Sequence, residues 1–530
     1  MDGRPGSVRS LVAGRGVHLG ALTAVLADRY GDRPAVHDTA ATPGVDHGEV
    51  RSFRDLEEVV GRSAAALRAD GLGPGDRVLV LLDNRLDVAL LTFALARLGA
   101  VPVPVNHRLT GRELAGVVRA TGATRALADP DLADGLPAGL SVVTSEMLGD
   151  AVRAAPERRL PPDPTLDADA TAVLLTTSGT TGVPKAAALT SRGLLGALGR
   201  LVALPVGWER GPRAGRDRVL AVLPLTHVMG LSTLLGAMSA GVPLVRRARF
   251  DPHEVLHLIE LHRPNVVVAV PTMYADLEAA GAAARDLACV QLWVAAADVM
   301  PTERARRFQR YGSLARVSGA HLGSAAFLDV FGMVELSGAA AVRLFPPAVV
   351  GALPAPPLTV ALPGVEVRAV DDDGDEVGAG QLGHLQWRGA GVLGGYEGQE
   401  EDGPGEDGWF GAGDRGRVWR GGVFQLAGRD RDRLKVSGFS VFPAEVEDEL
   451  HGGPGVAELA IVGVPDERTG DRLVALVVPA DDFGPDAFLA WAHDQVTGYR
   501  RPQDVVVVDA LPRGAHGKVD REAATALARR

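Results

Sequence analysis

The chain has 530 residues, too many for a single hydrophobic core, so we expect two or more domains. Hydrophobic residues make up 46% and charged residues 23%, as in an ordinary soluble globular protein. The formal net charge of −11 argues against binding of nucleic acid through a basic face. The single cysteine, Cys289, excludes a disulfide framework and a cysteine-based metal cluster and fits a reducing cytoplasm. We expect no membrane span, because no apolar run approaches roughly 20 residues. We also expect no signal peptide, because the N-terminal arginines precede only a broken apolar stretch.

The region from residue 53 to 129 alternates between helix and strand patterns. Residues 55–67 and 88–98 have the spacing of helices, whereas residues 76–82 and 101–105 read as buried strands. Such alternation predicts a parallel sheet flanked by helices, which belongs to the α/β class.

A loop rich in glycine and hydroxyl groups follows a short apolar strand predicted over residues 172–175. Its members are Thr177, Ser178, Gly179, Thr180, Thr181, Gly182, Val183, Pro184 and Lys185. The glycines permit tight turns that bring backbone N–H groups close to an anion, and the hydroxyl groups add uncharged donors. Lys185 adds a compact positive charge. The loop is therefore equipped to hold a polyphosphate, although its spacing differs from that of a Walker A loop.

This loop closely resembles the phosphate loop of the adenylate-forming superfamily, which contains acyl- and aryl-CoA synthetases, luciferases and the adenylation domains of peptide synthetases. The resemblance covers essentially the whole chain and is closest in kind to an acyl-CoA synthetase. It implies a large N-terminal domain of layered βα sheets over residues 1–428 and a small α+β C-terminal domain over residues 429–530, with a hinge near Arg431. It also implies that ATP and Mg²⁺ convert a carboxylic acid to an acyl-adenylate, which coenzyme A then attacks.

Two further segments match the family, one at its acid site and one at its nucleotide site. His227 lies in a Pro-Leu-x-His-x-x-Gly string. A lone histidine beside apolar residues is more often part of a core, but the resemblance makes His227 a pocket wall that orients the carboxylate. Ala296, Ala297 and Asp298 stand where the family has a glycine-rich loop between the adenine and the acyl pocket. Their methyl groups narrow this space, and Asp298 brings negative charge towards a phosphate-bearing ligand.

Residues 329–335 resemble the family's Tyr-Gly-x-Thr-Glu string. The resemblance places Asp329, Phe331 and Gly332 at the nucleotide and assigns Glu335 to Mg²⁺, for which a carboxylate is a suitable ligand. Val334 replaces the family's threonine, so a hydroxyl donor to the α-phosphate is lost.

An extra segment precedes this string, and its small residues predict volume beside the acyl group. They are Gly319, Ala320, Gly323, Ala325 and Ala326. We expect this segment to border the acyl site and the acid to be bulky and largely apolar.

The C-terminal motifs complete the resemblance. Asp414 and Arg429 match the residues that contact the ribose, and Lys518 matches a lysine that bridges the phosphate and carboxylate oxygens during adenylation. The residues assigned to the CoA and thioester step follow the hinge, and they are Lys435, Ser437, Gly438 and Phe439.

Other motif matches do not support a different activity. His253 and His257 form a His-Glu-x-x-His string, but His262 is one residue too early for the third ligand of a metzincin, and we interpret the segment as an ordinary surface helix. Two Gly-x-Gly-x-x-Gly matches, at residues 378–383 and 389–394, do not open the helix of a βαβ unit, so a dinucleotide fold is not supported.

Three functions stay open. The first is a complete acyl-CoA ligase, favoured by Lys518, Glu335 and the intact phosphate loop. The second is a relative impaired in adenylation, which forms the thioester from an acyl-adenylate supplied by a partner ligase, or a relative that loads an acyl carrier protein. The third is a non-catalytic relative that binds a nucleotide or an acyl ligand. The replacements at Ala296, Ala297, Asp298 and Val334 favour the second or third.

Overall fold

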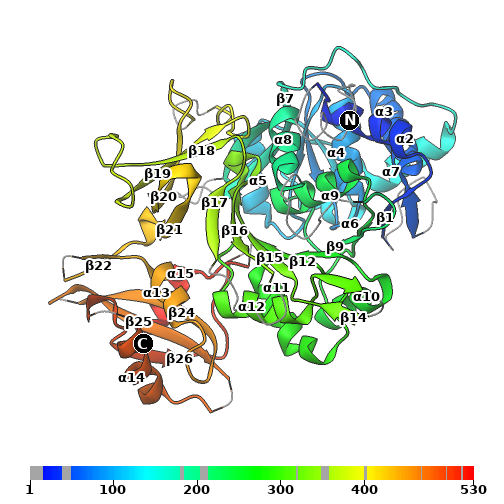
Figure 1. Cartoon of the computed structure of the whole chain (residues 1–530). Helices are drawn as coiled ribbons and strands as arrows, with labels where there is room; N and C mark the ends of the chain where they lie inside the picture. Colours follow the sequence, from blue (N-terminus) through cyan, green and yellow to red (C-terminus); the bar gives the residue numbers. More distant parts are fainter. Residues whose placement is uncertain are drawn as a thin grey trace.

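The computed structural model describes residues 16–38, 49–178, 184–202, 213–317, 320–347, 357–398, 403–437, 439–466, 468–480, 482–496, 498–514 and 517–529. These residues form a large N-terminal domain of several sheets and a smaller C-terminal domain, as Figure 1 shows. The predicted α/β class and two-domain organisation are therefore confirmed. The boundary after residue 428 and the hinge at Arg431 stay predictions.

The largest sheet has nine strands in the order β17-β16-β15-β12-β11-β9-β10-β1-β2. The six strands from β15 to β1 are parallel, and the strands at both edges are antiparallel. Their bounds are β1 Pro34–His37, β2 Val50–Ser52, β9 Val219–Ala221, β10 Leu244–Val245, β11 Val266–Ala269, β12 Leu292–Ala296, β15 Ala326–Met333, β16 Gly338–Phe345 and β17 Leu358–Ala361. Because the six central strands are parallel, their carboxyl ends all lie on the same side of the sheet, and ligands bind at this side in such sheets.

Helices connect and cover these strands. They are α2 Leu22–Tyr30, α8 Ser191–Val202, α9 Val228–Ala240, α10 Pro252–His262, α11 Pro271–Ala279 and α12 Thr302–Tyr311. The string with His253 and His257 lies on α10, as predicted, and both histidines are exposed. Helix α9 is apolar around most of its circumference because it is packed in the core of the N-terminal domain.

A second, four-stranded sheet contains the predicted βα alternation. Its order is β4-β3-β5-β6, all parallel, with bounds β3 Arg77–Leu81, β4 Val101–Pro104, β5 Arg125–Ala128 and β6 Ser141–Thr144. The accompanying helices are α3 Phe53–Ala69, α4 Asp87–Arg97, α5 Gly111–Thr121, α6 Pro130–Ala133 and α7 Ser145–Ala154. Helix α3 begins with a capping box in which Asp55 N donates to Ser52 Oγ (3.1 Å) and Ser52 N donates to Asp55 Oδ2 (2.7 Å).

Three smaller antiparallel units complete the N-terminal domain. The phosphate-loop segment joins β7 Thr171–Ser178 to β8 Pro184–Thr190. A meander contains β18 Val365–Val370, β19 Leu382–Gly389, β20 Phe410–Val418 and β21 Phe424–Arg429. A short hairpin pairs β13 Ala315–Val317 with β14 Ala320–Leu322. The two glycine-rich strings adjoin β19, which belongs to an antiparallel sheet rather than a βαβ unit.

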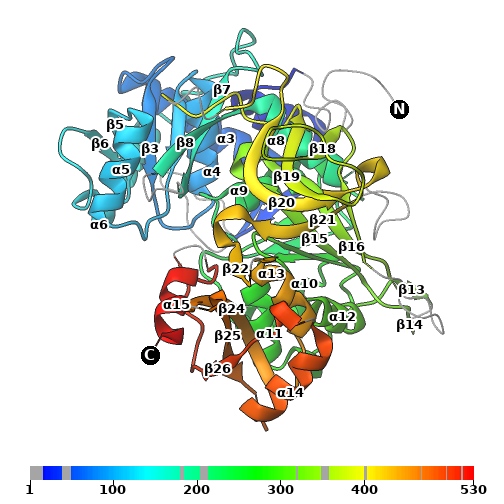
Figure 2. The ribbon, with the colours of Figure 1, turned by 90° about the vertical axis from the view of Figure 1, so that its left-hand side faces the viewer.

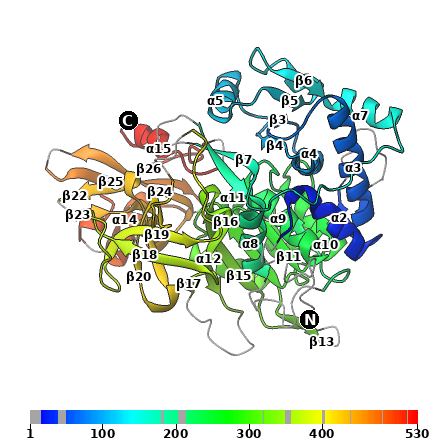
Figure 3. The same ribbon diagram turned by 90° about the horizontal axis from the view of Figure 1, so that it is seen from above.

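The C-terminal domain has its own hydrophobic core, built from residues between 434 and 528. Its sheet has the order β23-β22-β25-β24, and β26 also pairs with β25. The bounds are β22 Leu434–Val436, β23 Phe439–Val441, β24 Val456–Asp466, β25 Gly470–Pro479, β26 Asp504–Val507, α13 Pro443–Leu450, α14 Pro485–Gln495 and α15 Arg521–Ala528. Figure 2 shows this domain against the side of the N-terminal domain that holds α11 and α12. Seen from above in Figure 3, it lies on the opposite side of the molecule from α3 and α7.

No helix in the described ranges is long and apolar enough to cross a lipid bilayer.

Candidate active site

A cleft of about 1850 Å³ opens at the carboxyl ends of the parallel strands, between the two domains. The cleft is lined by residues that lie more than 300 positions apart in the sequence. The predicted residues among them are Thr177, Lys185, His227, Ala296, Ala297, Asp298, Asp329, Phe331, Gly332, Val334, Glu335, Asp414, Arg429 and Lys518. The structure therefore brings together the predicted acid, nucleotide and metal residues, while the role of each stays a prediction.

Not all of the predicted loop can be placed. Gly179, Thr180, Thr181 and Gly182 lie outside the described residues, as does Gly438 of the segment assigned to the CoA step. Ser178 ends β7, and Thr177 pairs with Lys185 across the β7–β8 ladder. The two ends of the phosphate loop therefore meet at the cleft.

The C-terminal domain contributes Lys518 to the cleft. The side chain of Lys518 is exposed to the cleft, but protein surrounds its ammonium on most sides, and this desolvation lowers the pKa of Lys518. Asp298 and Asp414 oppose the decrease, whereas Arg429 and Arg431 add to it. Lys518 thus lies among charges of both signs, and three of them belong to residues predicted to bind the nucleotide: Asp298, Asp414 and Arg429.

Asp414 and Arg429 face each other across β20 and β21. Arg429 Nε lies 3.3 Å from Asp414 Oδ1, and the two residues are register partners in the meander. Burial raises the pKa of Asp414, and the Arg429 charge opposes that effect. The second oxygen, Asp414 Oδ2, is buried and accepts no hydrogen bond from the described part of the chain. A buried carboxylate oxygen of this kind can accept hydrogen bonds from a ligand's hydroxyl groups.

Glu335 and Lys185 are connected by a residue that the sequence analysis did not assign. The Tyr396 hydroxyl donates to Glu335 Oε1 at 2.7 Å, and Lys185 Nζ lies 5.1 Å from the centre of the Tyr396 ring. A cation at this distance is attracted to the electron-rich face of the ring. Tyr396 lies two residues after the glycine-rich string of residues 389–394, and an aromatic residue next to such a string was the available signal.

The loop after β12 holds a strained backbone position. Ala297 has a φ of 76°, in the left-handed region that favours glycine. The resemblance predicted glycine in the family at this position, so the structure gives a physical reason for that preference. Ala297 and Asp298 are both exposed to the cleft, and Val299 N donates to Asp298 Oδ1 at 2.9 Å.

Asp329 lies beneath this loop rather than beside open solvent. Burial raises its pKa to about 6, although Arg343 and a hydrogen bond from Met300 N oppose that increase. Arg343 Nη2 lies 2.9 Å from Asp329 Oδ2, and Arg343 Nη1 lies 3.6 Å from Asp448 of α13. Arg343 therefore links the floor of the cleft to the C-terminal domain. Sequence reasoning missed it, although a single arginine within the otherwise apolar run of β16 is a recognisable signal.

The neighbouring string on β15 shapes the nucleotide side of the cleft. Phe331 stacks on Trp387 with the ring centres 5.1 Å apart. A side chain at Gly332 would collide with the Gly338 backbone, so only glycine fits there. Val334 follows in a short 3₁₀ turn and presents an apolar side chain to the cleft.

An apolar branch of the cleft runs inward from His227, which is the N-cap residue of α9. One face of α9 lines it with residues spaced three or four apart: Met229, Ser232, Thr233, Gly236, Ala237 and Ala240. The facing strands line it over their full length, from Ala296 back to Leu292 on β12, which at ~3.3 Å per residue is about 13 Å. The inner end is apolar, with Val219, Val242 and Val266 beside Leu292.

The extra segment around residues 318–326 does not border the acyl site, so that prediction is wrong for the part that the structure describes. Residues 320–326 are absent from the lining of the cleft, and β13 and β14 form a hairpin in which Leu322 is exposed. The physical reason is topological. The segment connects α12 to the beginning of β15 and therefore lies at the amino ends of the strands, opposite the cleft. Small residues on α9 supply the volume instead.

The residues assigned to the CoA step lie outside the cleft. Lys435, Ser437 and Phe439 are exposed on β22, β23 and the turn between them, and Phe439 stacks on Tyr499 with ring centres 4.3 Å apart. Their role in thioester formation stays a prediction, and it requires a rotation of the C-terminal domain. Lys435, Lys185 and Lys518 are the three lysines of the chain.

Comparison with known proteins gives the family. Residues 24–397 match the AMP-binding enzyme family, and residues 445–518 match the AMP-binding enzyme C-terminal domain. A feruloyl-CoA synthase of Amycolatopsis sp is 32% identical over 92% of this chain and 95% of its own length. The fatty acid–[acyl-carrier-protein] ligase ScoC of Streptomyces coeruleorubidus is 30% identical over 92% of this chain and 93% of its own length. Among solved structures, ATP-bound MatB from Rhodopseudomonas palustris is 27% identical, with a TM-score of 0.78 over 96% of this chain and 99% of MatB.

The chain therefore belongs to the AMP-binding enzyme family, which confirms the predicted membership of the adenylate-forming superfamily. The prediction of an ATP-dependent acid–thiol ligase is confirmed at the same level, because the matched relatives are ligases of this type.

Proposed function

We propose that the chain is a complete acyl-CoA ligase that acts on a bulky, largely apolar carboxylic acid. The observation that carries the proposal is the presence of Lys518, Lys185, His227, Glu335 and Asp414 in one cleft, with Lys518 supplied by the C-terminal domain. An enzyme that makes an acyl-adenylate needs cations at the phosphates, acceptors for the ribose and a site for the acid in a single space.

In the first step, an oxygen of the substrate carboxylate attacks the α-phosphorus of ATP, and pyrophosphate leaves with the electrons of the broken P–O bond. Lys185 neutralises charge on the phosphates, and Lys518 bridges the oxygens between which negative charge develops. His227 orients the carboxylate at the mouth of the apolar branch. In the second step, the CoA sulfur attacks the carbonyl carbon, AMP leaves, and the thiol proton passes to solvent.

The residues of the cleft fit a magnesium ion. Glu335 offers a carboxylate, the ligand type that this hard cation prefers. The Tyr396 hydroxyl donates to Glu335 Oε1 at 2.7 Å and so helps to fix the orientation of this carboxylate in the cleft. Glu335 would hold the ion, whose charge would lower the cost of gathering phosphate oxygens at this site.

The apolar branch supports the choice of acid. Its inner end has room for a group far larger than acetate, and its lining there has no charged side chain among the described residues. Burial of a matching ligand is favourable by about 0.8 kcal/mol per CH₂. The feruloyl-CoA synthase relative also acts, by its name, on an aromatic acid, which supports an acid of this size.

The test is a screen of carboxylic acids for pyrophosphate release with ATP and Mg²⁺, followed by analysis of the thioester product. Aryl-propenoic, indole-acetic and medium-chain aliphatic acids form the test set, with acetate and butyrate as short controls. We expect the larger acids to give the higher kcat/KM. Best turnover with acids of two to four carbons would contradict the proposed substrate class.

A second candidate is a ligase with impaired adenylation, which is favoured by Val334 and by the left-handed Ala297 beside Asp298. A synthetic acyl-adenylate supplied with CoA separates the two candidates, since only an impaired enzyme would need it. Replacement of CoA by a phosphopantetheinylated carrier protein tests the other acceptor, which the ScoC relative supports. Loss of both half-reactions with every acid would favour a non-catalytic binding protein. The cytoplasmic location predicted from the single cysteine stays a prediction.

A further inference from the structure

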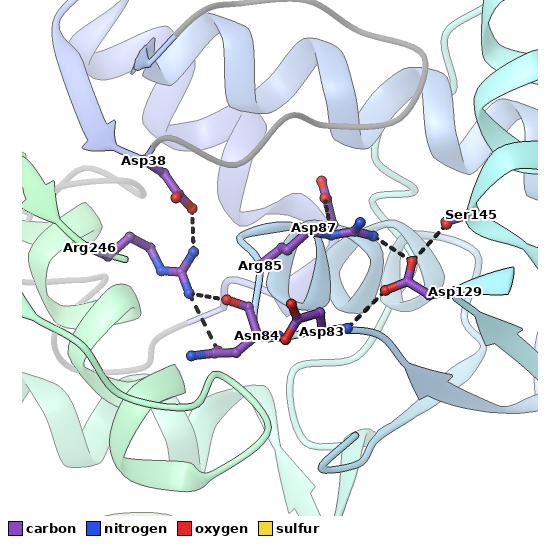
Figure 4. Close-up of polar contacts among 8 residues, drawn as sticks. All are labelled: Asp38, Asp83, Asn84, Arg85, Asp87, Asp129, Ser145 and Arg246. Carbon is purple, nitrogen blue, oxygen red and sulfur yellow. Dashed lines mark hydrogen bonds and ion pairs between the residues drawn. The ribbon is translucent and has the colours of Figure 1, made fainter. Parts of the chain in front are cut away.

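Figure 4 shows a cluster of polar side chains that includes Asn84, Arg246 and Asp38. Asn84 follows β3 of the four-stranded sheet and is 8% exposed. Its Oδ1 accepts a hydrogen bond from Leu225 N at 3.1 Å. Its Nδ2 donates to Ala248 O at 2.9 Å and to Leu223 O at 3.4 Å. One carboxamide therefore contacts two backbone segments of the nine-stranded sheet, both of which line the cleft.

Arg246 fixes this asparagine in place. Its Nη2 donates to Asn84 O at 2.8 Å, and its Nη1 donates to the carboxylate of Asp38. Arg246 and Asp38 are each 1% exposed. Because a buried ion pair is strongly destabilised when one partner is removed, neither charge can easily leave this arrangement. The orientation of Asn84 is therefore determined from behind, by a charge pair that does not itself line the cleft.

The loop transmits this constraint to His227. His227 N donates to Pro224 O at 3.2 Å, so the chain from Leu223 to His227 forms a tight turn. A side chain at Gly230 would collide with the same Pro224 carbonyl, which shows how closely the first turn of α9 packs on this turn. A shift of Leu225 away from Asn84 would therefore move the His227 backbone and ring with it.

We infer that Asn84 is a positioning residue for the reaction, because it sets the place of His227 relative to the acid through the backbone of residues 223–225. The inference rests on the proposed role of His227. Arg246 and Asp38 act through Asn84. A displacement of a substrate-orienting group by about 1 Å can lower the rate roughly 100-fold. Loss of the hydrogen bonds from Asn84 should therefore lower the rate by a measurable amount.

The test is a double-mutant cycle on the full-length enzyme, with pyrophosphate release from the best acid of the screen as the measurement. We expect Asn84→Ala to lower kcat/KM for the acid roughly 10- to 100-fold while KM for ATP changes little. In the His227→Ala background, Asn84→Ala should cost less than about 3-fold, because the group it positions is gone. Equal losses in both backgrounds would overturn the inference.

Two controls separate positioning from folding. The first control is Asn265→Ala, which, like Asn84→Ala, removes a hydrogen-bonded carboxamide. Asn265 Oδ1 accepts a hydrogen bond from Arg218 N, and Asn265 Nδ2 donates one to the Gln291 side chain. Asn265 lies at the amino ends of the strands, away from His227. We therefore expect Asn265→Ala to lower kcat/KM by the same factor with and without His227→Ala, even if it lowers the stability of the protein. Arg246→Lys keeps a charge for Asp38 but loses the hydrogen bond to Asn84, and it replaces Asn84→Ala if that variant does not fold.

Hydrogen exchange provides a readout independent of turnover. Amides of residues 223–230 should exchange faster in Asn84→Ala than in the unaltered enzyme, whereas amides of α10 should not change. Unchanged exchange in residues 223–230 would contradict the inference even if activity falls. A fully active His227→Ala enzyme would instead contradict the proposed role of His227, and the inference with it.

Discussion

The Tyr396 hydroxyl donates a 2.7 Å hydrogen bond to Glu335 Oε1, and the same ring lies beneath the ammonium of Lys185. One side chain thus touches both the proposed metal ligand and the proposed phosphate cation. Tyr396 belongs to the chain after β19, whereas Glu335 follows β15, so the contact also joins the meander to the nine-stranded sheet.

Tyr396→Phe should separate these two contacts, because it keeps the ring under Lys185 and removes only the hydroxyl. A hydrogen bond to a charged group is worth about 1.5–3 kcal/mol, so we expect a loss of roughly 10-fold or more in kcat and a higher Mg²⁺ requirement. The measurement is pyrophosphate release over a range of Mg²⁺ concentrations. Tyr311→Phe, on α12 outside the cleft, is the matched control. An unchanged Mg²⁺ dependence would contradict the role assigned to Tyr396.

Lys518→Ala should abolish adenylation and spare thioester formation from a supplied acyl-adenylate. Only the first step needs a cation between the reacting oxygens, and Lys518 is in the cleft while Lys435 is outside it. Lys435→Ala is the reciprocal variant, for which we expect adenylation to survive. The two half-reactions are measured separately, and equal loss of both in Lys518→Ala would rule out the assignment.

Ala297→Gly should relieve the strained backbone at φ 76°. A non-glycine residue in this region costs on the order of 1–3 kcal/mol, part of which the greater freedom of glycine in the unfolded chain offsets. We expect a small gain in stability by urea unfolding. Ala295→Gly, in the buried strand β12, should instead destabilise the protein and serves as the control.

The same substitution has a catalytic counterpart. Combined with Ala296→Gly and Val334→Thr, it restores the residue types that the resemblance predicts in the family. A recovered donor to the α-phosphate is worth on the order of 3 kcal/mol in the transition state, or about 100-fold. If adenylation is slow in the unaltered enzyme, the triple variant should accelerate it, and no change would show that another contact limits the rate.

Ala240→Phe should exclude the longest acids from the enzyme, because Ala240 lines the inner end of the apolar branch and the phenyl ring would fill that space. We expect a lower kcat/KM for the longest acids and little change for short ones, with KM for ATP unaffected. The measurement is kcat/KM across a series of straight-chain acids. A uniform decrease at every length would indicate general damage to α9 instead of a filled pocket.

His451 gives a pH dependence to the contact between the domains. Burial, and then the charges of Arg304 and Arg307, lower the pKa of His451 to about 4 from 6.5, while Glu278 opposes this. When the C-terminal domain is released or unfolded, His451 regains its ordinary pKa of 6.5 and binds a proton as pH falls below that value. In the folded structure His451 stays neutral down to about pH 4, so the folded state loses stability over this range. The loss is at most about 3 kcal/mol by the time pH reaches 4.

We therefore expect unfolding measurements between pH 7 and pH 5 to show a steeper loss of stability in the unaltered protein than in His451→Gln. Identical pH profiles would contradict the assignment. A parallel decrease in adenylation at pH 5 in the unaltered enzyme alone would connect the contact to the delivery of Lys518.

The sequence predicted the site more completely than its surroundings. Lys518, Asp414 and Glu335 were found because each lies in a short string that resembles a motif of the adenylate-forming superfamily. Tyr396 and Arg343 were not found, because their importance depends on which neighbours the fold brings to them. Asn84 has no local signal at all, since its partners are backbone groups more than 130 positions away.

The error at residues 318–326 has a similar origin. Small residues do indicate space, but the position of that space depends on which end of a strand the segment joins. The connection before β15 lies at the amino ends, and no local composition reveals this without the strand order.

The distribution of lysines has a practical consequence for chemical labelling. Apart from the α-amino group, Lys185, Lys435 and Lys518 are the only primary amines, and arginine provides the remaining 52 of the 55 Lys and Arg residues. Two of the three line the cleft and one is exposed on the C-terminal domain. An amine-selective reagent should therefore modify Lys435 whether or not ATP is bound, while ATP should shield the other two. Peptide mass spectrometry of the labelled chain would then report occupancy of the cleft at single-residue resolution, with Lys435 as the internal standard.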